Sequence, residues 1–429
     1  MQGNIPSPVL LMIKHEVKQM SYFWKNDFVE LKMITEEAQD SIFEVLHDTK
    51  TRRQADHGID LPATKSLAGD MIGYAIEGSE SGDELWFSII NEEQEMVGYA
   101  VIDWINERMG NAQFAITIFR QFRRQHYGSH AAEILLAYLF HERRFHKVGC
   151  CVIEGNMEGE SFMESLGFSL DAFRSEMFYT QGGYVGESYY SMLREEYDQH
   201  QKAKQGYAQK TYHAHLVPDS TLGISSKQSK KKIAPLYDER SYFWEYDGIL
   251  LRDMTEEDDL KNHEIIYDTE ASIFFDSDVK LPQVKDELTD FEKSHLHFGC
   301  DDDRLEFAIS DLEGNYVGNI NLCGLDKKNG KFSFSIYLLK QFRGKGYAAK
   351  ALRLVLCYAF EELRMHKMIS CVNMGNTASA ALMRSVGCTV EGVLRDNEYY
   401  HGAYVDVVVF GVTREEFWTS VTGSALACN

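Results

Sequence analysis

The chain has 429 residues, of which 44% are hydrophobic and 12% are aromatic. This length predicts two or three domains, and the apolar fraction is typical of a globular protein and argues against general disorder. The net charge of -22 at pH 7 excludes general binding to nucleic-acid phosphates, which requires a basic face. A field of this sign favours a cationic small substrate, although solubility alone also explains it.

The cysteines and the N-terminal segment indicate the cellular compartment of the protein. None of the 8 cysteines forms a C-x-x-C pair, so the sequence predicts no zinc site and no redox motif. Cysteines in apolar runs are typical of a reducing, cytoplasmic protein. Residues 9–13 are apolar, but charged residues follow at once, so this stretch is too short for a signal peptide or a membrane span.

The chain repeats itself at a constant offset of 220 residues. Ser21–Trp24 recurs as Ser241–Trp244, and Gln121–Arg123 recurs as Gln341–Arg343. Such an offset over a whole domain length indicates two copies of one fold. We expect an extension at 1–20, a first domain at 21–197, a polar linker at 198–240, a second domain at 241–420 and a tail at 421–429.

Strand and helix patterns alternate within each copy. In chain order, the second copy predicts strands at 248–252, 305–310, 316–323, 332–338, 368–372 and 403–410, and helices at 256–268, 347–364 and 377–386. This order gives an α/β fold in which a mixed central sheet is flanked by helices.

The segment Gln341-Phe342-Arg343-Gly344-Lys345-Gly346-Tyr347-Ala348 joins an alternating strand to a long amphipathic helix. Glycines at such a turn let the backbone approach a ligand, and the N–H groups at a helix start attract a pyrophosphate. Arg343 and Lys345 can add positive charge to the same anion. The spacing fits neither a Rossmann fingerprint nor a Walker loop.

In this context the segment resembles the coenzyme A motif of the GNAT N-acetyltransferases. Downstream, Asn376–Ser379 and Ser385–Cys388 are similar to the family's next conserved stretch, and Gly392–Arg395 and Gly402–Asp406 are similar to the tail of its RimJ/RimL-like branch. The resemblance covers about residues 241 to 418. It implies two tandem GNAT-type domains that use acetyl-CoA and no metal.

The resemblance also implies roles for single residues. The backbone of Ile336, Tyr337 and Leu338 would pair with the pantetheine arm, and Gln341 with the N–H groups of residues 343–348 would hold the pyrophosphate. Asn376 and Ser379 would face the pantetheine or the thioester, and a role for Asn376 as a helix cap is compatible with this.

The acid and the base are harder to place. Many family members use a tyrosine as the acid, but Met383 stands at the matching position, and the strand at 332–338 carries no glutamate. Tyr399 and Tyr400 are the leading candidates. The other candidates, each of which also reads as a packing, surface or turn residue, are His401, Glu306, Ser333 and Ser335.

The first copy departs from the motif. Arg124 and His126 stand where the second copy has Gly344 and Gly346. Each adds a side chain where the backbone would meet a phosphate, so we expect a degenerate, non-catalytic first domain. The function predicted is transfer of an acetyl group to a small-molecule amine or a peptide N-terminus by a monomer or homodimer. The alternative is a non-catalytic, acyl-CoA-binding or ligand-sensing protein.

Overall fold

A computed structural model of the chain describes residues 22–55, 62–204, 243–262, 268, 304–400 and 402–422. These residues divide into two compact units, whose boundaries do not follow the repeat. One unit contains residues 22–51, 62–104 and 114–144. The other contains residues 52–55, 105–113, 145–204 and the whole described part of the second copy. Strands of both copies therefore meet inside the second unit.

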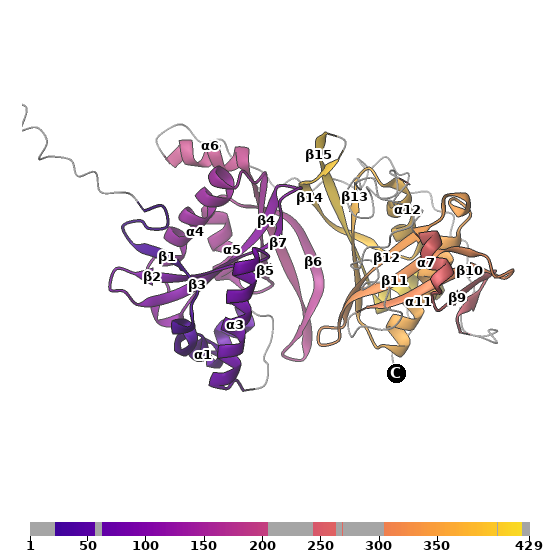
Figure 1. Ribbon diagram of the computed structural model, residues 1–429, viewed down its shortest axis with the longest axis horizontal. Helices are drawn as coiled ribbons and strands as arrows, with labels where there is room; N and C mark the ends of the chain where they lie inside the picture. Colours follow the sequence, from indigo (N-terminus) through magenta and orange to yellow (C-terminus); the bar gives the residue numbers. More distant parts are fainter. Residues whose placement is uncertain are drawn as a thin grey trace, which may run out of the picture. The chain divides into compact units, whose positions relative to one another are not determined.

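The first unit is a sheet with helices on both of its faces (Figure 1). Its elements are β1 (Val29–Met33), a 3-10 turn (Glu36–Ala38), α1 (Gln39–His47), α3 (Lys65–Ser81), β2 (Leu85–Asn91), most of β3 (Met96–Asn106), most of β4 (Asn111–Ile118), α4 (Tyr127–Ala137) and a π-helical turn (Tyr138–Glu142). The strands follow the order β1-β2-β3-β4. Ile42, Ala68 and Ile72 form a small core between α1, α3 and the sheet, because apolar residues at helical spacing face one side.

The second unit begins with elements of the first copy. These are most of α2 (Thr49–Ala55), β5 (Lys147–Ile153), α5 (Met157–Leu166), β6 (Ser169–Thr180), β7 (Gly183–Leu193) and α6 (Arg194–Lys204). The second copy contributes β8 (Glu245–Tyr246), β9 (Ile249–Arg252), α7 (Glu256–Asn262), β10 (Leu305–Asp311), β11 (Tyr316–Asp326), β12 (Lys331–Leu338), a 3-10 turn (Lys340–Phe342), α11 (Tyr347–Cys357), a π turn (Tyr358–Glu362), β13 (Lys367–Asn373), α12 (Thr377–Ser385), β14 (Thr389–Tyr400), β15 (Ala403–Thr413) and α13 (Arg414–Thr422).

The sheet of the second unit joins the two copies through β6 and β14. The strand order is β5-β7-β6-β14-β15-β13-β12-β11-β10-β9-β8, with the first residues of β4 beside β5. Most neighbours are antiparallel, but β12 and β13 are parallel, so the sheet is mixed as expected. Strand β14 was not among the predicted strands. Helix α6 runs to Lys204, so the first residues of the predicted linker are helical, and residues 205–240 lie outside the described residues.

Strands β6 and β14 touch at one point of very close approach. Gly392 is paired with Ala172, its own equivalent at the 220-residue offset. A Cβ atom on Gly392 would lie 2.1 Å from the Ala172 Cβ and 2.4 Å from its Cα. The two equivalent strands therefore meet around a local two-fold axis, and one of them must carry a glycine at the crossing point.

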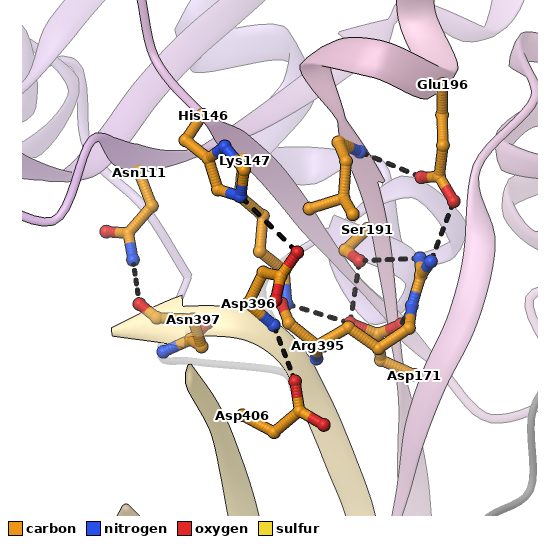
Figure 2. A network of polar contacts seen from close by, with 11 residues as sticks. Asn111, His146, Lys147, Asp171, Ser191, Glu196, Arg395, Asp396, Asn397 and Asp406 are labelled. Carbon is orange, nitrogen blue, oxygen red and sulfur yellow. Dashed lines mark hydrogen bonds and ion pairs between the residues drawn. The ribbon is translucent and has the colours of Figure 1, made fainter. Parts of the chain in front are cut away.

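Two buried lysines flank this crossing point. The Lys147 Nζ atom donates to the Asp171 carboxylate at 2.9 Å and to the carbonyl of Arg395 at 2.6 Å (Figure 2). The Arg395 guanidinium then binds both Asp171 and Glu196 at 2.7 Å. Burial opposes the charge on Asp171, but the charges of Lys147 and Arg395 outweigh it and hold the pKa of that carboxyl below its usual range.

The same arrangement recurs on the other side of the axis. The Lys367 Nζ atom donates to Glu391 at 2.6 Å and also to the carbonyl of Ser175. Each lysine thus pairs with a carboxylate of its own copy and with a carbonyl of the other copy. Rings repeat the pattern: Tyr404 stacks on His146 with centroids 3.6 Å apart, and Tyr184 stacks on His366 at 3.5 Å.

The described residues contain neither a membrane-spanning helix nor a cluster of metal ligands. None of the helices in these residues is both long and apolar enough to cross a membrane. Nor does any group of three or more His, Cys, Asp or Glu side chains among them stand in a position to hold a metal ion.

The crossing point predicts that Gly392→Ala destabilises the protein by about 1–3 kcal/mol, because the added methyl group overlaps Ala172. Denaturant unfolding followed by circular dichroism measures the change. Gly73→Ala is the matched control: a Cβ there meets nothing within 4 Å, and Gly73 lies inside α3, so this change should stabilise by about 0.5–1 kcal/mol. Equal effects of the two substitutions would contradict the close approach.

The buried charges predict that Asp171→Asn costs about 3–5 kcal/mol, because the Lys147 ammonium keeps its burial and loses its carboxylate. The double variant Lys147→Met with Asp171→Leu should recover a large part of this loss, since an apolar pair leaves no stranded charge. Chemical denaturation of the two variants tests this. A double variant less stable than Asp171→Asn would show that the charge is not the cause.

Candidate functional site

The parallel strands of the second copy separate and leave a wedge between them. Among the described residues, β12 and β13 pair only through Lys331 with Lys367 and Phe332 with Met368. Beyond these pairs β12 continues to Leu338, bonded to β11, and β13 continues beside β15. One edge of β12 is thus left facing the wedge, and an extended ligand could pair with the backbone of residues 336–338, as the resemblance implies.

The predicted coenzyme loop lies at the carboxyl end of β12. Gly344 has a φ of 74° and Gly346 a φ of 84°, both in the left-handed region that favours glycine. A Cβ on either glycine would meet nothing within 4 Å, so the space outside the loop is open. The first helical bond runs from Lys350 N to Gly346 O at 3.3 Å, and the preceding N–H groups form the start of α11. This arrangement suits a pyrophosphate.

Two of the predicted loop side chains are already engaged. The Arg343 Nε atom donates to Leu338 O at 2.9 Å, and its Nη2 atom lies 2.8 Å from the Asp268 carboxylate. The guanidinium therefore ties the loop to the end of β12. The backbone N–H of Arg343 donates to Lys340 O at 3.4 Å, so it is not free for the predicted phosphate role. Lys345 is exposed, with its Nζ 5.6 Å from the centre of the Phe342 ring. Gln341 is also exposed.

A second helix begins at the end of β13. The Asn376 Oδ1 atom accepts from Ser379 N at 3.0 Å and caps α12, as the sequence predicted for a cap. The equivalent Asn156 accepts from Gly159 N at 3.1 Å in the first copy. The starts of α11 and α12 thus follow the carboxyl ends of the two strands that line the wedge.

The first copy keeps the shape of the loop without its glycines. Arg124 has a φ of 64° and His126 a φ of 62°, and His130 N bonds to His126 O at 3.1 Å, as in the second copy. An L-residue pays about 1–2 kcal/mol for this conformation. Both side chains are exposed on the loop. The surrounding fold therefore imposes the backbone, and the sequence decides what the loop presents.

The residue at the position of the family's tyrosine is part of the hydrophobic core. Met383 is 1% exposed and belongs to the main apolar cluster of the second copy. Its equivalent in the first copy, Met163, is also buried. Neither side chain can donate a proton.

The two tyrosine candidates lie near the end of β14. Tyr399 donates its backbone N–H to Met109 Sδ at 3.1 Å, and its ring lies 5.1 Å from that of Tyr404. This places Tyr399 at the contact with the first copy. The Tyr400 side chain and His401 lie outside the described residues, so their roles stay predictions.

Polar side chains of the second copy gather on the sheet face opposite the main core. Glu306 accepts from Asn319 at 2.8 Å, and Ser335 donates to Asn321 at 2.8 Å. Ser333, on the same face of β12, is paired with Cys323 of β11. In the first copy the equivalents of the first four residues are apolar or aromatic: Trp86, Tyr99, Ala115 and Val101.

A further pair on this face was missed by the sequence analysis. Asn373, the last residue of β13, donates its Nδ2 proton to Glu398 Oε2 at 2.7 Å. The equivalents in the first copy are Ile153 and Phe178, which pack together with Met177 in an apolar cluster. A position-by-position comparison of the two copies contains this signal, because two apolar positions change to polar ones together.

Both copies are similar to known acetyltransferases. The family described as acetyltransferase (GNAT) domain matches residues 29–169 and again 249–389. The chain is 36% identical over 115 residues to an uncharacterized, SPbeta prophage-derived N-acetyltransferase of Bacillus subtilis (strain 168), covering 27% of this chain and 65% of that protein. A second relative from the same strain, whose name proposes a ribosomal N-acetyltransferase, is 34% identical over 105 residues, or 24% of this chain and 57% of the relative.

A third relative is the spermidine N(1)-acetyltransferase of Escherichia coli (strain K12), 24% identical over 131 residues, which cover 30% of this chain and 68% of that enzyme. The chain spans less than two thirds of the length of the first two relatives. The family matches fall on both copies at equivalent positions and together cover more than half of the chain. The chain therefore belongs to the GNAT acetyltransferase family and contains its domain twice, in tandem.

Proposed function

We propose that the second copy transfers an acetyl group from acetyl-CoA to a primary amine and that the first copy has no turnover. One observation carries this proposal. The second copy combines glycines at both left-handed loop positions with polar groups on the face beside the wedge, whereas the first copy has Arg124 and His126 in the loop and Ile153 and Phe178 on that face.

Different parts of the wedge hold different parts of acetyl-CoA. The N–H groups of residues 344–348 hold the pyrophosphate, and Lys345 adds a positive charge from the exposed side of the loop. The free edge of β12 at Ile336–Leu338 pairs with the pantetheine arm. Asn376 and Ser379, at the start of α12, lie toward the thioester end.

The chemistry asks for a neutral amine and a leaving thiolate. Met383 is buried and offers no proton to the thiolate. A thiol with a pKa near the reference value of about 8.5 leaves without an acid, so loss of a proton from the amine becomes the step that the protein must assist. Tyr399 and Tyr400 remain candidate proton donors of lower rank.

The acceptor belongs to one of two classes, a small-molecule amine or a peptide N-terminus. One relative is named for spermidine and another for the ribosome. The net charge of -22 favours a cationic small amine, because the field of the protein concentrates cations.

A non-catalytic, acyl-CoA-binding or ligand-sensing role is the second candidate, and the buried Met383 favours it. The test is release of free thiol from acetyl-CoA in the presence of polyamines, amino acids and peptides with free N-termini. We expect release with at least one cationic amine. Tight acetyl-CoA binding without release for any member of the panel would instead support the second candidate.

The loop predicts one tight acetyl-CoA site per chain in calorimetric titration, because only one loop has glycines at both positions. Gly346→His should abolish this site, since the imidazole covers the N–H donors and charge-assisted bonds worth about 1.5–3 kcal/mol each are lost. The variant should still fold, because His126 adopts the same conformation in the first copy.

The matched control is His126→Gly, which should leave the affinity of the tight site unchanged. Two equivalent sites in the native chain, or full affinity in folded Gly346→His, would contradict this assignment of the coenzyme loop.

A further inference from the structure

A row of polar side chains crosses three strands of the second copy beside the wedge. Glu306 on β10, Asn321 on β11 and Ser335 on β12 are successive cross-strand partners, so their side chains project from one face of the sheet. Ser335 donates to Asn321 at 2.8 Å, and Asn319 Nδ2 donates to Glu306 Oε1 at 2.8 Å. The two amides are 7% and 3% exposed, whereas Glu306 and Ser335 are only partly buried. The buried amides therefore hold the two groups that a ligand can reach.

In the first copy the same positions are occupied by apolar and aromatic residues that pack. Trp86 and Tyr99, the equivalents of Glu306 and Asn319, pack against the small core of α1 and α3, and their rings stack with centroids 5.8 Å apart. Val101, the equivalent of Asn321, is 6% exposed. Polar groups at packing positions cost free energy unless they find partners. Their replacement of apolar residues in the second copy is expected where a polar ligand binds.

The surroundings of the wedge direct an acceptor toward this row. On the opposite face, Phe334 belongs to the main core together with residues of α11 and α12. Toward β13, the hairpin β6–β7 of the first copy closes the polar face: the Lys331 Nζ atom lies 4.0 Å from the centre of the Phe178 ring, and Ile369 packs against Met177 and Phe178. An acceptor whose nitrogen reaches a thioester in the wedge can therefore extend over β12, β11 and β10.

Glu306 places a negative charge at the far end of the row. Arg304 Nη2 lies 3.8 Å from Glu306 Oε2, but the Arg304 side chain is 45% exposed, so water screens this pair and it contributes little. The carboxylate can therefore bind a further cation. Neighbouring strands lie about 4.7–4.9 Å apart, which puts Glu306 two strands, or about 10 Å, from Ser335.

We propose that Glu306 binds a second positively charged nitrogen of the acceptor, so that the acceptor is a diamine or polyamine whose reacting nitrogen lies in the wedge. This inference rests on the proposed function. Asn319 acts as a positioning residue, because it holds the carboxylate by one hydrogen bond. Ser335 and Asn321 give the path between the two ends a polar lining. Glu306 contributes to acceptor binding and takes no part in proton transfer.

The experiment compares three linear acceptors of equal length: a diamine, the amino alcohol in which a hydroxyl replaces one amine, and the alkylamine in which a methyl group replaces it. For the native chain, kcat/KM for the diamine should exceed that for the alkylamine by about 10- to 100-fold, because only the diamine forms the charge-assisted bond. Glu306→Gln should remove this advantage through KM and leave kcat unchanged, since the bond is the same before and during the reaction.

Two further variants separate recognition from general damage. Asn319→Ala should reduce the preference for the diamine and leave kcat/KM for the alkylamine unchanged, which a loss of folded protein would not do. Glu313→Gln is the matched control. Glu313 is exposed in the turn of the same β10–β11 hairpin, so this variant removes an equal charge away from the row and should retain the native preference.

A native preference for the amino alcohol or the alkylamine would overturn the inference, as would an undiminished diamine preference in Glu306→Gln or an equal loss in Glu313→Gln. Calorimetric binding of the diamine to protein loaded with coenzyme A makes the test independent of turnover. If the native chain releases no thiol with any amine, the proposed function fails. Loss of diamine binding in Glu306→Gln would still support the Glu306 site, and unchanged binding would overturn it.

Discussion

The fold of the second unit depends on two lysines that neither copy can satisfy alone. A buried ammonium group costs several kcal/mol unless it is paired and fully hydrogen-bonded. Lys147 and Lys367 have side chains that are each 1% exposed, and each takes a carboxylate from its own copy and a carbonyl from the other. This requirement fixes β6 against β14. It also determines where the hairpin β6–β7 lies on the second copy, and therefore which groups close the face beside the wedge.

Local patterns in the sequence predicted the features of the fold that depend on local interactions, such as helix starts, helix caps and alternating strands. The start of α11 at Tyr347, the cap at Asn376 and the strands β10 and β11 all follow from glycines, a capping side chain and alternating apolar residues. The 220-residue offset predicted the duplication, because a repeat can be recognised in the sequence without knowledge of the structure. Strand β14 escaped prediction: it contains Gly392 and the polar run Arg395–Glu398, its pairing with β15 is irregular, and its other neighbour is β6.

The polar pair of the candidate site escaped for a related reason. Asn373 and Glu398 come together across β15, so their contact depends on the order β13-β15-β14 and not on sequence spacing. Tyr399, the next residue along, attracted attention because tyrosine is a known acid in this family, yet it lies against Met109. Residue type therefore suggested Tyr399, whereas the order of the strands places its neighbour Glu398 next to Asn373 beside the wedge.

The crossing of β6 and β14 also has a consequence for how the protein responds to dilution. Two separate chains held together by such a contact would come apart as their concentration falls, because association is bimolecular. Here both strands belong to one polypeptide, so their association is intramolecular and does not depend on the concentration of the protein. The hairpin that closes the face beside the wedge is therefore present at any abundance of the protein, and a single molecule carries everything that this face requires.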